Sequence, residues 1–265
     1  MNKTAFVIIA TSVFICGYIS PTDAGLVGFW NFNEGVGTTV NDSSEFDNNG
    51  YFTSGTPNWT QGKYGNALLF NGTPNGVVTV PYSGSLYLND SFTIGAWVMP
   101  LSVGDNRVIE HYTAGNPMGV ILRQAPSPDL GKWQVASSMT NLWSNTQIQQ
   151  NIWQYIVVTY DGSNMKFYVD GNLDSLVLAS GGLYDGGDPW IIGGTLNDPG
   201  APNSYNGAID EVRIYNIALT QEEIVRDLNT DSKVPEPASM FLLSSGLLGA
   251  FFRKKEWFYK KDGIL

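Results

Sequence analysis

Apolar and polar residues alternate along several short stretches of this chain. The alternation is clearest in residues 76–80, 91–99, 153–169 and 209–215, and glycine, asparagine, aspartate and proline separate these stretches. Because successive side chains of a β-strand point to opposite faces, a period of two residues predicts strands joined by turns. The pattern over most of the chain therefore predicts an all-β domain.

The same stretches predict how the strands pair and stack. In 153–169 a turn at Asp161-Gly162 joins two apolar strands, because glycine tolerates the positive φ that such turns need. The stretch 91–99 places Phe92, Ile94, Ala96 and Val98 on one face, and Thr93, Gly95, Trp97 and Met99 on the other. Strands that are largely apolar on both faces are typical of stacked sheets, so we expect a two-sheet antiparallel sandwich.

One short helix is expected near the end of this domain. Thr220 is followed three residues later by Glu223, which is the spacing of a capping box. Ile224, Val225 and Leu228 then form a short apolar stripe. We expect a helix that begins after Thr220 and ends near Leu228.

Composition and charge narrow the classes of partner. The chain has 30 glycines and only 14% charged residues, which fits a β protein with many turns. Residues 25–233 contain eight basic and 20 acidic side chains, a net charge of −12. A negative field repels phosphate backbones and anionic lipid, so we expect no nucleic-acid binding. Bound cations and neutral polysaccharide remain compatible with this charge.

The first 24 residues are typical of a secretory signal peptide. Lys3 precedes an apolar run over 4–18, and Thr22 and Ala24 supply the small residues that a signal peptidase recognises. We expect cleavage after Ala24, with a retained membrane anchor as the alternative. Cleavage would remove Cys16, which is the only cysteine.

The last segment, 234–265, has the pattern of a second targeting segment. Its parts are Pro235, Glu236 and Pro237, an apolar run over 238–252, and the basic cluster Arg253, Lys254 and Lys255. The run would form a helix of about 22 Å, shorter than the roughly 30 Å hydrocarbon core, with the basic cluster on the cytoplasmic side. We expect a transient membrane segment, with an ordinary C-terminal membrane anchor as the alternative.

The order of these parts resembles the PEP-CTERM sorting signal of Gram-negative bacteria. The resemblance implies processing by an exosortase and a location in the cell envelope, at the cell surface or in the extracellular matrix. Residues 229–233 would link this signal to the preceding domain.

Residues 25–228 resemble the laminin-G-like jelly roll of the concanavalin A-like lectin and glucanase superfamily. The resemblance is carried by the segments LVGFWNFNEGVGT, GKYGNALLFNG, FTIGAWVMP, WQYIVVTYDGSNMKFYVDG and the stretch 207–215 running into Ala218-Leu219-Thr220. It implies two antiparallel sheets, one of them concave, with ligand sites among the loops at the rim in many members. The fold alone does not determine the function.

The sequence does not favour catalysis. Glycoside hydrolysis needs two carboxylates held about 5–10 Å apart, and glucanases of this superfamily carry them on one strand as Glu-x-Asp-x-x-Glu, which this chain lacks. Asp210 and Glu211 are adjacent on a strand and should therefore point to opposite faces. His111 is the only histidine, and the sequence has no Gly-x-Ser-x-Gly motif that would supply a serine nucleophile for it to activate. We expect a protein that is not an enzyme, with a divergent glycanase as a less favoured alternative.

Aromatic residues favour sugar binding instead. The apolar C–H faces of sugar rings stack on aromatic rings, and their hydroxyl groups need polar partners. The chain has eight tryptophans and 13 tyrosines, many of them beside asparagine or aspartate. We select Trp133, Trp143, Tyr184 and Trp190 as the ligand-binding candidates. The alternative is that these rings only cover the edges of the sheets.

The resemblance also implies one structural calcium ion. Relatives often hold it with an acid in the C-terminal strand and with oxygens near the first strand, positions that match Asp210, Asn33 and Asn49 here. Calcium takes such carboxylate and carbonyl oxygens. Pairing of Asp210 with Arg213, or with a turn N–H, is the alternative.

These observations together predict an exported binding module at the cell surface. The expected partners are carbohydrate of an exopolysaccharide or biofilm matrix, besides the signal peptidase and exosortase that process the chain. The alternative is a structural or adhesive protein that binds other surface proteins.

Overall fold

The computed structural model describes residues 25–53, 58–73, 76–112, 119–183, 186–196 and 203–230. The chain divides into two units, Met1–Thr230 and Asp231–Leu265, and all described residues belong to the first. The signal peptide, the linker from residue 231 and the sorting segment lie outside the described residues. Within the described ranges, no helix has the length and apolar character needed to cross a membrane.

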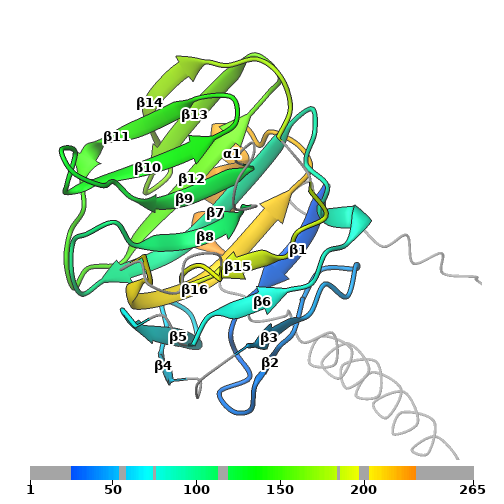
Figure 1. Cartoon of the computed structure of the whole chain (residues 1–265), viewed down its shortest axis with the longest axis vertical. Coiled ribbons are helices and arrows are strands. Elements are labelled where there is room, and N and C mark those ends of the chain that lie inside the picture. Colours follow the sequence, from blue (N-terminus) through cyan, green and yellow to red (C-terminus); the bar gives the residue numbers. More distant parts are fainter. Residues whose placement is uncertain are drawn as a thin grey trace, which may run out of the picture. The chain divides into compact units, whose positions relative to one another are not determined.

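The first sheet, sheet A, is antiparallel and has the long strand β16 near its centre (Figure 1). In spatial order its strands are β14 (Asn172–Leu178), β13 (Asn164–Val169), β12 (Gln154–Tyr160), β7 (Phe92–Pro100), β16 (Asn206–Tyr215), β5 (Asn66–Asn71) and β4 (Trp59–Gln61), and β1 (Leu26–Trp30) also pairs with β16. Strands from the two ends of the domain, β1 and β16, are therefore neighbours in this sheet.

The second sheet, sheet B, is antiparallel as well. In spatial order its strands are β11 (Asn141–Gln147), β10 (Lys132–Ser137), β9 (Val120–Gln124), β8 (Arg107–His111), β15 (Trp190–Ile192), β6 (Val78–Val80), β3 (Gly50–Phe52) and β2 (Thr39–Val40). A short 3-10 helix, η1 (Gly84–Leu86), precedes β7. The expected two-sheet antiparallel sandwich with one short helix is confirmed.

The main hydrophobic core lies between the two sheets. Both contribute fully buried apolar side chains, such as Ile94 and Val158 from sheet A and Val80 and Leu122 from sheet B. The predicted hairpin forms β12 and β13, and the Asp161 carboxylate accepts the turn N–H groups of Ser163 and Asn164. The alternation therefore produces the inner face in the expected way.

The charged end of β16 departs from simple alternation. The pairing with β7 shifts register between Asp210 and Arg213, and Glu211 has a positive φ of 52°. This β-bulge re-aims the Glu211 side chain so that its Oε2 accepts a hydrogen bond from the Arg213 guanidinium. The expectation that Asp210 and Glu211 simply alternate between the two faces is therefore wrong. Both acids are fully buried.

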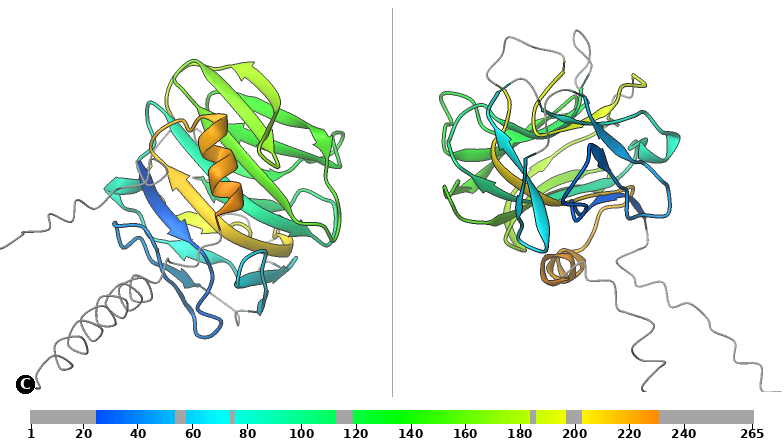
Figure 2. Two further views of the ribbon diagram at one scale, coloured as in Figure 1. Left: turned by 180° about the vertical axis from the view of Figure 1, so that it is seen from behind. Right: turned by 90° about the horizontal axis from the view of Figure 1, so that it is seen from below.

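The helix α1 (Gln221–Asn229) packs on the outer face of sheet A (Figure 2). Its predicted capping box is present, with the Thr220 side chain and Glu223 bonded reciprocally. Ile224 packs against Trp97 and Tyr155 of the sheet in a second apolar cluster. The helix thus covers part of the outer face of sheet A.

A carboxylate holds the first long loop against β1. Asp42 Oδ1 accepts the backbone N–H groups of Phe29 at 2.8 Å and Ser44 at 2.9 Å, and its Oδ2 accepts that of Asn48 at 2.9 Å. The Asn48 side chain in turn donates to the carbonyl of Val27 at 2.7 Å. The loop from β2 to β3 is therefore fastened to sheet A by buried polar contacts.

We expect Asp42→Ala to destabilise the domain by about 2–4 kcal/mol, because three backbone N–H groups lose their acceptor. Urea unfolding followed by tryptophan fluorescence measures this change. Glu45→Ala removes the same charge from an exposed side chain of the same loop and serves as the control. Equal effects of the two substitutions would contradict the role assigned to Asp42.

Candidate binding surface on the second sheet

The pairing register places one row of side chains across the outer face of sheet B. The row runs from β3 to β11 through Tyr51, Thr79, Ile191, Glu110, Ile121, Ala136 and Asn141. These residues alternate with core residues such as Val80, Trp190 and Val135, so they point away from the core.

The middle of this row is buried and mostly apolar. Ile191, Ile121 and Ala136 are almost completely buried, and Glu110 has no exposed surface. Tyr51 and Asn141 at the two ends are exposed. Among the described residues, the floor of this face is therefore aliphatic and carries one carboxylate, and its accessible parts lie towards the edges of the sheet.

The buried carboxylate of Glu110 is paired with Arg107. The Arg107 Nη1 donates to Glu110 Oε2, and the arginine also lies over the ring of Tyr112, with 5.5 Å from Cζ to the ring centroid. Arg107 Nε is buried and donates no hydrogen bond, and the Thr195 side chain also bonds to the Glu110 carboxylate. Burial raises the pKa of Glu110, and the neighbouring guanidinium only partly opposes this shift.

Sequence reasoning missed this ion pair. A register shift between β8 and β9 lies between Arg107 and Ile109, and the two charges meet although they are three residues apart. The available signal was two opposite charges inside the otherwise apolar strand Arg107–His111. Such a pair inside a strand is unusual because buried charges need partners.

Next to β11 the outer face becomes polar, and it is accessible at Asn141 and in part at Trp143, whereas Gln134 is 3% exposed. We call Asp105, Arg123, Gln134, Asn141 and Trp143 the Trp143 strip. Trp143 on β11 is the direct pairing partner of Gln134 on the neighbouring strand β10, and its side chain is half-buried. The Arg123 Nε donates to Gln134 Oε1 at 2.9 Å, and its Nη1 donates to Asp105 Oδ1 at 3.1 Å. The Trp143 indole can stack on the apolar face of a sugar ring, and the Arg123 guanidinium, which Gln134 and Asp105 hold in place, can bond to its hydroxyl groups.

The other aromatic candidates do not join this strip. Trp133 is fully buried, and Trp190 is 2% exposed and stacks on His111 with ring centroids 5.0 Å apart. Both point into the core from β10 and β15, so their selection as ligand-binding residues was wrong. Tyr184 lies outside the described residues. The choice of Trp143 is compatible with its position, and its role stays a prediction.

Exposed tyrosines were overlooked in the sequence. Tyr51 is 49% exposed on the outer face of sheet B, and Tyr82 and Tyr87 are similarly exposed near η1. Tyr51 alternates with Gly50 and Phe52 on a three-residue strand. A strand this short has too little periodicity to show which face is outward.

The three predicted calcium ligands do not form one group. Asp210 Oδ2 accepts the N–H of Tyr64 at 3.0 Å, and Asn33 Oδ1 accepts that of Asn66 at 2.9 Å, so both border the same turn. Asn49 instead uses its Oδ1 for the N–H of Asp42 in another loop, at 2.8 Å. The residues therefore do not fit a calcium site as a set.

The Asp210 carboxyl group is buried, and this burial raises its pKa to about 8. Its Oδ1 is buried and accepts no hydrogen bond. The alternative of a turn N–H partner is the one that the structure contains, whereas Arg213 pairs with Glu211. No group of three or more His, Cys, Asp or Glu side chains that could hold a metal occurs within the described ranges.

Comparison with protein families gives two matches. Residues 71–225 match the family described as the concanavalin A-like lectin/glucanases superfamily. Residues 233–255 match the PEP-CTERM protein-sorting motif. A comparison with curated proteins gives no match.

Solved structures resemble the fold at low sequence identity. Domain 4 of AbnA, an extracellular arabinanase of Geobacillus stearothermophilus in complex with arabinotriose, has a TM-score of 0.62 and 19% identity over 78% of this chain and 99% of that domain. The binding domain of Paraclostridial Mosquitocidal Protein 1 has a TM-score of 0.62 and 16% identity over 78% of this chain. A sialidase of Trypanosoma rangeli has a TM-score of 0.54 and 18% identity over 79% of this chain.

The chain spans about half of the mosquitocidal chain, 52%, and one third of the sialidase chain, 33%. At these identities the likeness extends to the fold alone.

We expect Arg107→Met to destabilise the domain by about 3 kcal/mol at pH 7.5, because it removes the guanidinium that pairs with the buried Glu110 carboxylate. The variant should recover stability at pH 5. The pKa of Glu110 is raised in the folded state, so on a rise in pH the unfolded state loses its proton first, and stability falls. Urea unfolding at both pH values measures the effect.

The double substitution Arg107→Met with Glu110→Gln is the matched control. It removes both charges, so it should be more stable than the single variant at pH 7.5 and lose the additional dependence on pH. A single variant that is as stable as the parent at pH 7.5 would contradict the buried pair.

Proposed function

The chain belongs to the concanavalin A-like lectin/glucanase superfamily and carries a PEP-CTERM protein-sorting motif, and from this we propose that it is a surface-sorted module that binds carbohydrate. The sorting motif implies export and sorting to the bacterial cell surface, with processing by an exosortase. The proposed location is the envelope or matrix of a Gram-negative bacterium, and the proposed ligand is an exopolysaccharide.

The observation that carries the proposal is the Trp143 strip. It combines a half-buried indole with the Arg123 guanidinium, whose position is fixed by hydrogen bonds to the buried Gln134 amide and to Asp105. Fixed groups bind with a smaller loss of side-chain entropy than mobile ones. The arabinanase domain of the same fold, which was solved with arabinotriose, supports the carbohydrate class.

We propose that the module acts without catalysis. Asp210 and Glu211 are adjacent acids, but both are fully buried. Glu110 on the outer face of sheet B is buried and bonded to Arg107, which does not leave it available as a general acid or base for a bound polymer. Assay of reducing-sugar release from the bound polysaccharide tests this point, and release that Glu110→Gln abolishes would overturn it.

Strand β14 supports a second candidate function, adhesion to other surface proteins. It lies at the edge of sheet A, and its residues Leu173, Leu176 and Leu178 are exposed, Leu178 by 78%. Exposed leucines on an edge strand are typical of surfaces that contact another protein. Leu176→Lys should impair such adhesion and leave polysaccharide binding unchanged.

We expect Trp143→Ala to weaken binding of the full chain to its polysaccharide by roughly tenfold, since stacking on an aromatic ring contributes about 1 kcal/mol or more. A glycan array identifies the ligand, and titration calorimetry with the best oligosaccharide measures the loss. Tyr87→Ala removes an exposed aromatic ring beside η1 and is the control.

Equal binding by both variants would exclude the Trp143 strip as the site. Absence of binding to every glycan, including the polysaccharides of PEP-CTERM-bearing bacteria, would overturn the proposed function itself. Retained matrix incorporation by Trp143→Ala, combined with loss in Leu176→Lys, would favour the adhesive function.

A further inference from the structure

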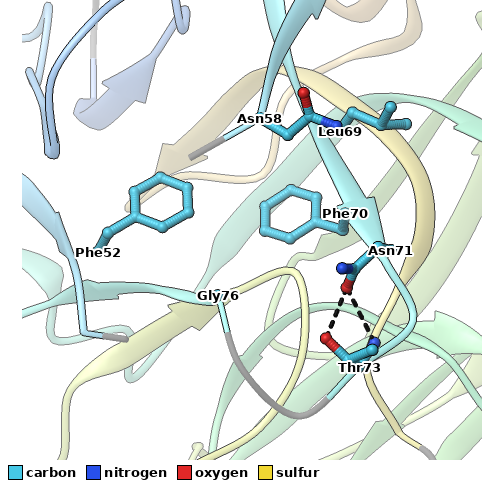
Figure 3. A pocket seen from close by; sticks show the side chains of 7 residues that line it. All are labelled: Phe52, Asn58, Leu69, Phe70, Asn71, Thr73 and Gly76. Atoms are coloured by element: carbon cyan, nitrogen blue, oxygen red, sulfur yellow. Dashed lines mark hydrogen bonds between the residues drawn. The ribbon is translucent and has the colours of Figure 1, made fainter. Parts of the chain in front are cut away.

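A small pocket opens beside Phe52 and Phe70 (Figure 3), whereas β11 and β14 lie at the opposite ends of their sheets. It lies between β3 of sheet B and β5 of sheet A, and its volume is about 50 Å³. Ligand pockets for drug-sized molecules have roughly 300 Å³ or more. This pocket therefore accepts a group of a few heavy atoms and excludes a complete sugar ring.

Two phenyl rings form the apolar part of the pocket. Phe52 projects from β3 and Phe70 from β5, and their rings lie on either side of the opening in Figure 3. Phe70 belongs to the core and Phe52 packs against it. Gly193 lies directly behind Phe70, since a Cβ atom there would lie 2.0 Å from a ring carbon. The core therefore fixes the position of the Phe70 ring.

An amide with an unused donor lies beside the rings. Asn71 Oδ1 accepts hydrogen bonds from the Thr73 N–H at 3.1 Å and the Thr73 hydroxyl at 2.6 Å (Figure 3). These bonds fix the orientation of the side chain and leave Nδ2 without a partner in the described part of the chain. Nδ2 points to the side of the pocket on which the two phenyl rings lie.

A second amide borders the pocket from the other side. Asn58 is exposed, and its backbone carbonyl accepts the N–H of Leu69 at 2.8 Å, which anchors it next to β5. Its side chain makes no hydrogen bond to the described residues. The pocket thus offers an apolar slot and a fixed N–H donor, with the Asn58 amide at its border.

The slot and the donor match the parts of one small group. A methyl group fills a slot between phenyl rings, and a carbonyl accepts from Asn71 Nδ2. We infer that the pocket binds the acetamido group of an N-acetylated sugar in a neutral polysaccharide. The net charge of −12 over residues 25–233 disfavours acidic sugars. The inference rests on the proposed carbohydrate binding, but its residues are separate from the Trp143 strip.

The test uses the ¹⁵N-labelled full chain and N-acetylglucosamine trimer as the probe. The side-chain NH₂ signals of Asn71, assigned by their loss in Asn71→Asp, should shift with this trimer and stay unchanged with glucose trimer. Asn71→Asp keeps an oxygen for Thr73, removes the donor and adds one negative charge, so it should weaken binding of the N-acetylated trimer about tenfold.

Gln61→Glu is the control for charge, because Gln61 is exposed on β4 and does not line the pocket. Phe52→Leu keeps an apolar side chain but removes the ring, and it should also weaken binding of the N-acetylated trimer without lowering the Tm by more than a few degrees.

Equal shifts with both trimers, or none at Asn71 with either, would overturn the inference. If the glycan array is positive and Trp143→Ala abolishes binding while Asn71→Asp does not, only the pocket is excluded. If no glycan binds at all, both the proposed function and the inference about the pocket are overturned.

Discussion

The β-bulge in β16 is the constraint on which the rest of the domain depends. This strand pairs with β1, β5 and β7 and contributes Ile209, Val212 and Ile214 to the core. A strand without a bulge would carry Glu211 towards that core. The extra residue, with a positive φ at Glu211, lets the acid reach Arg213 instead, whose guanidinium lies 4.1 Å from the ring centroid of Phe29. A buried charge is tolerated here because it has a partner.

This arrangement determines which surface is left for recognition. The charged outer side of β16 is buried, and α1 packs on the same face, with the Tyr215 hydroxyl donating to Asp227 of the helix at 2.7 Å. The middle of the outer face of sheet A is therefore covered by α1 and contributes to stability. The accessible polar and aromatic groups that suit a ligand lie at the two sides of sheet B, at β11 and at β3.

The two sides offer different chemistry to the polysaccharide that we propose as the ligand. The Trp143 strip presents an indole with fixed polar neighbours, whereas the pocket beside Phe52 has room for only one small group. A polymer that reaches both would bind the second site as an intramolecular event, which strengthens weak contacts without any new surface. Such a distribution suits a protein that holds long chains at the cell surface rather than one that encloses a short ligand.

Local information in the sequence was sufficient for the strands, the hairpin at Asp161, the capping box at Thr220 and the family. Each of these depends on residues that are close along the chain or on a recognisable order of segments. The tertiary structure decided that Trp133 and Trp190 point inward, that Glu211 lies in a bulge and that Glu110 meets Arg107. A period of two distinguishes two faces of a strand but does not say which one meets the core, because that depends on register with strands far away in the sequence.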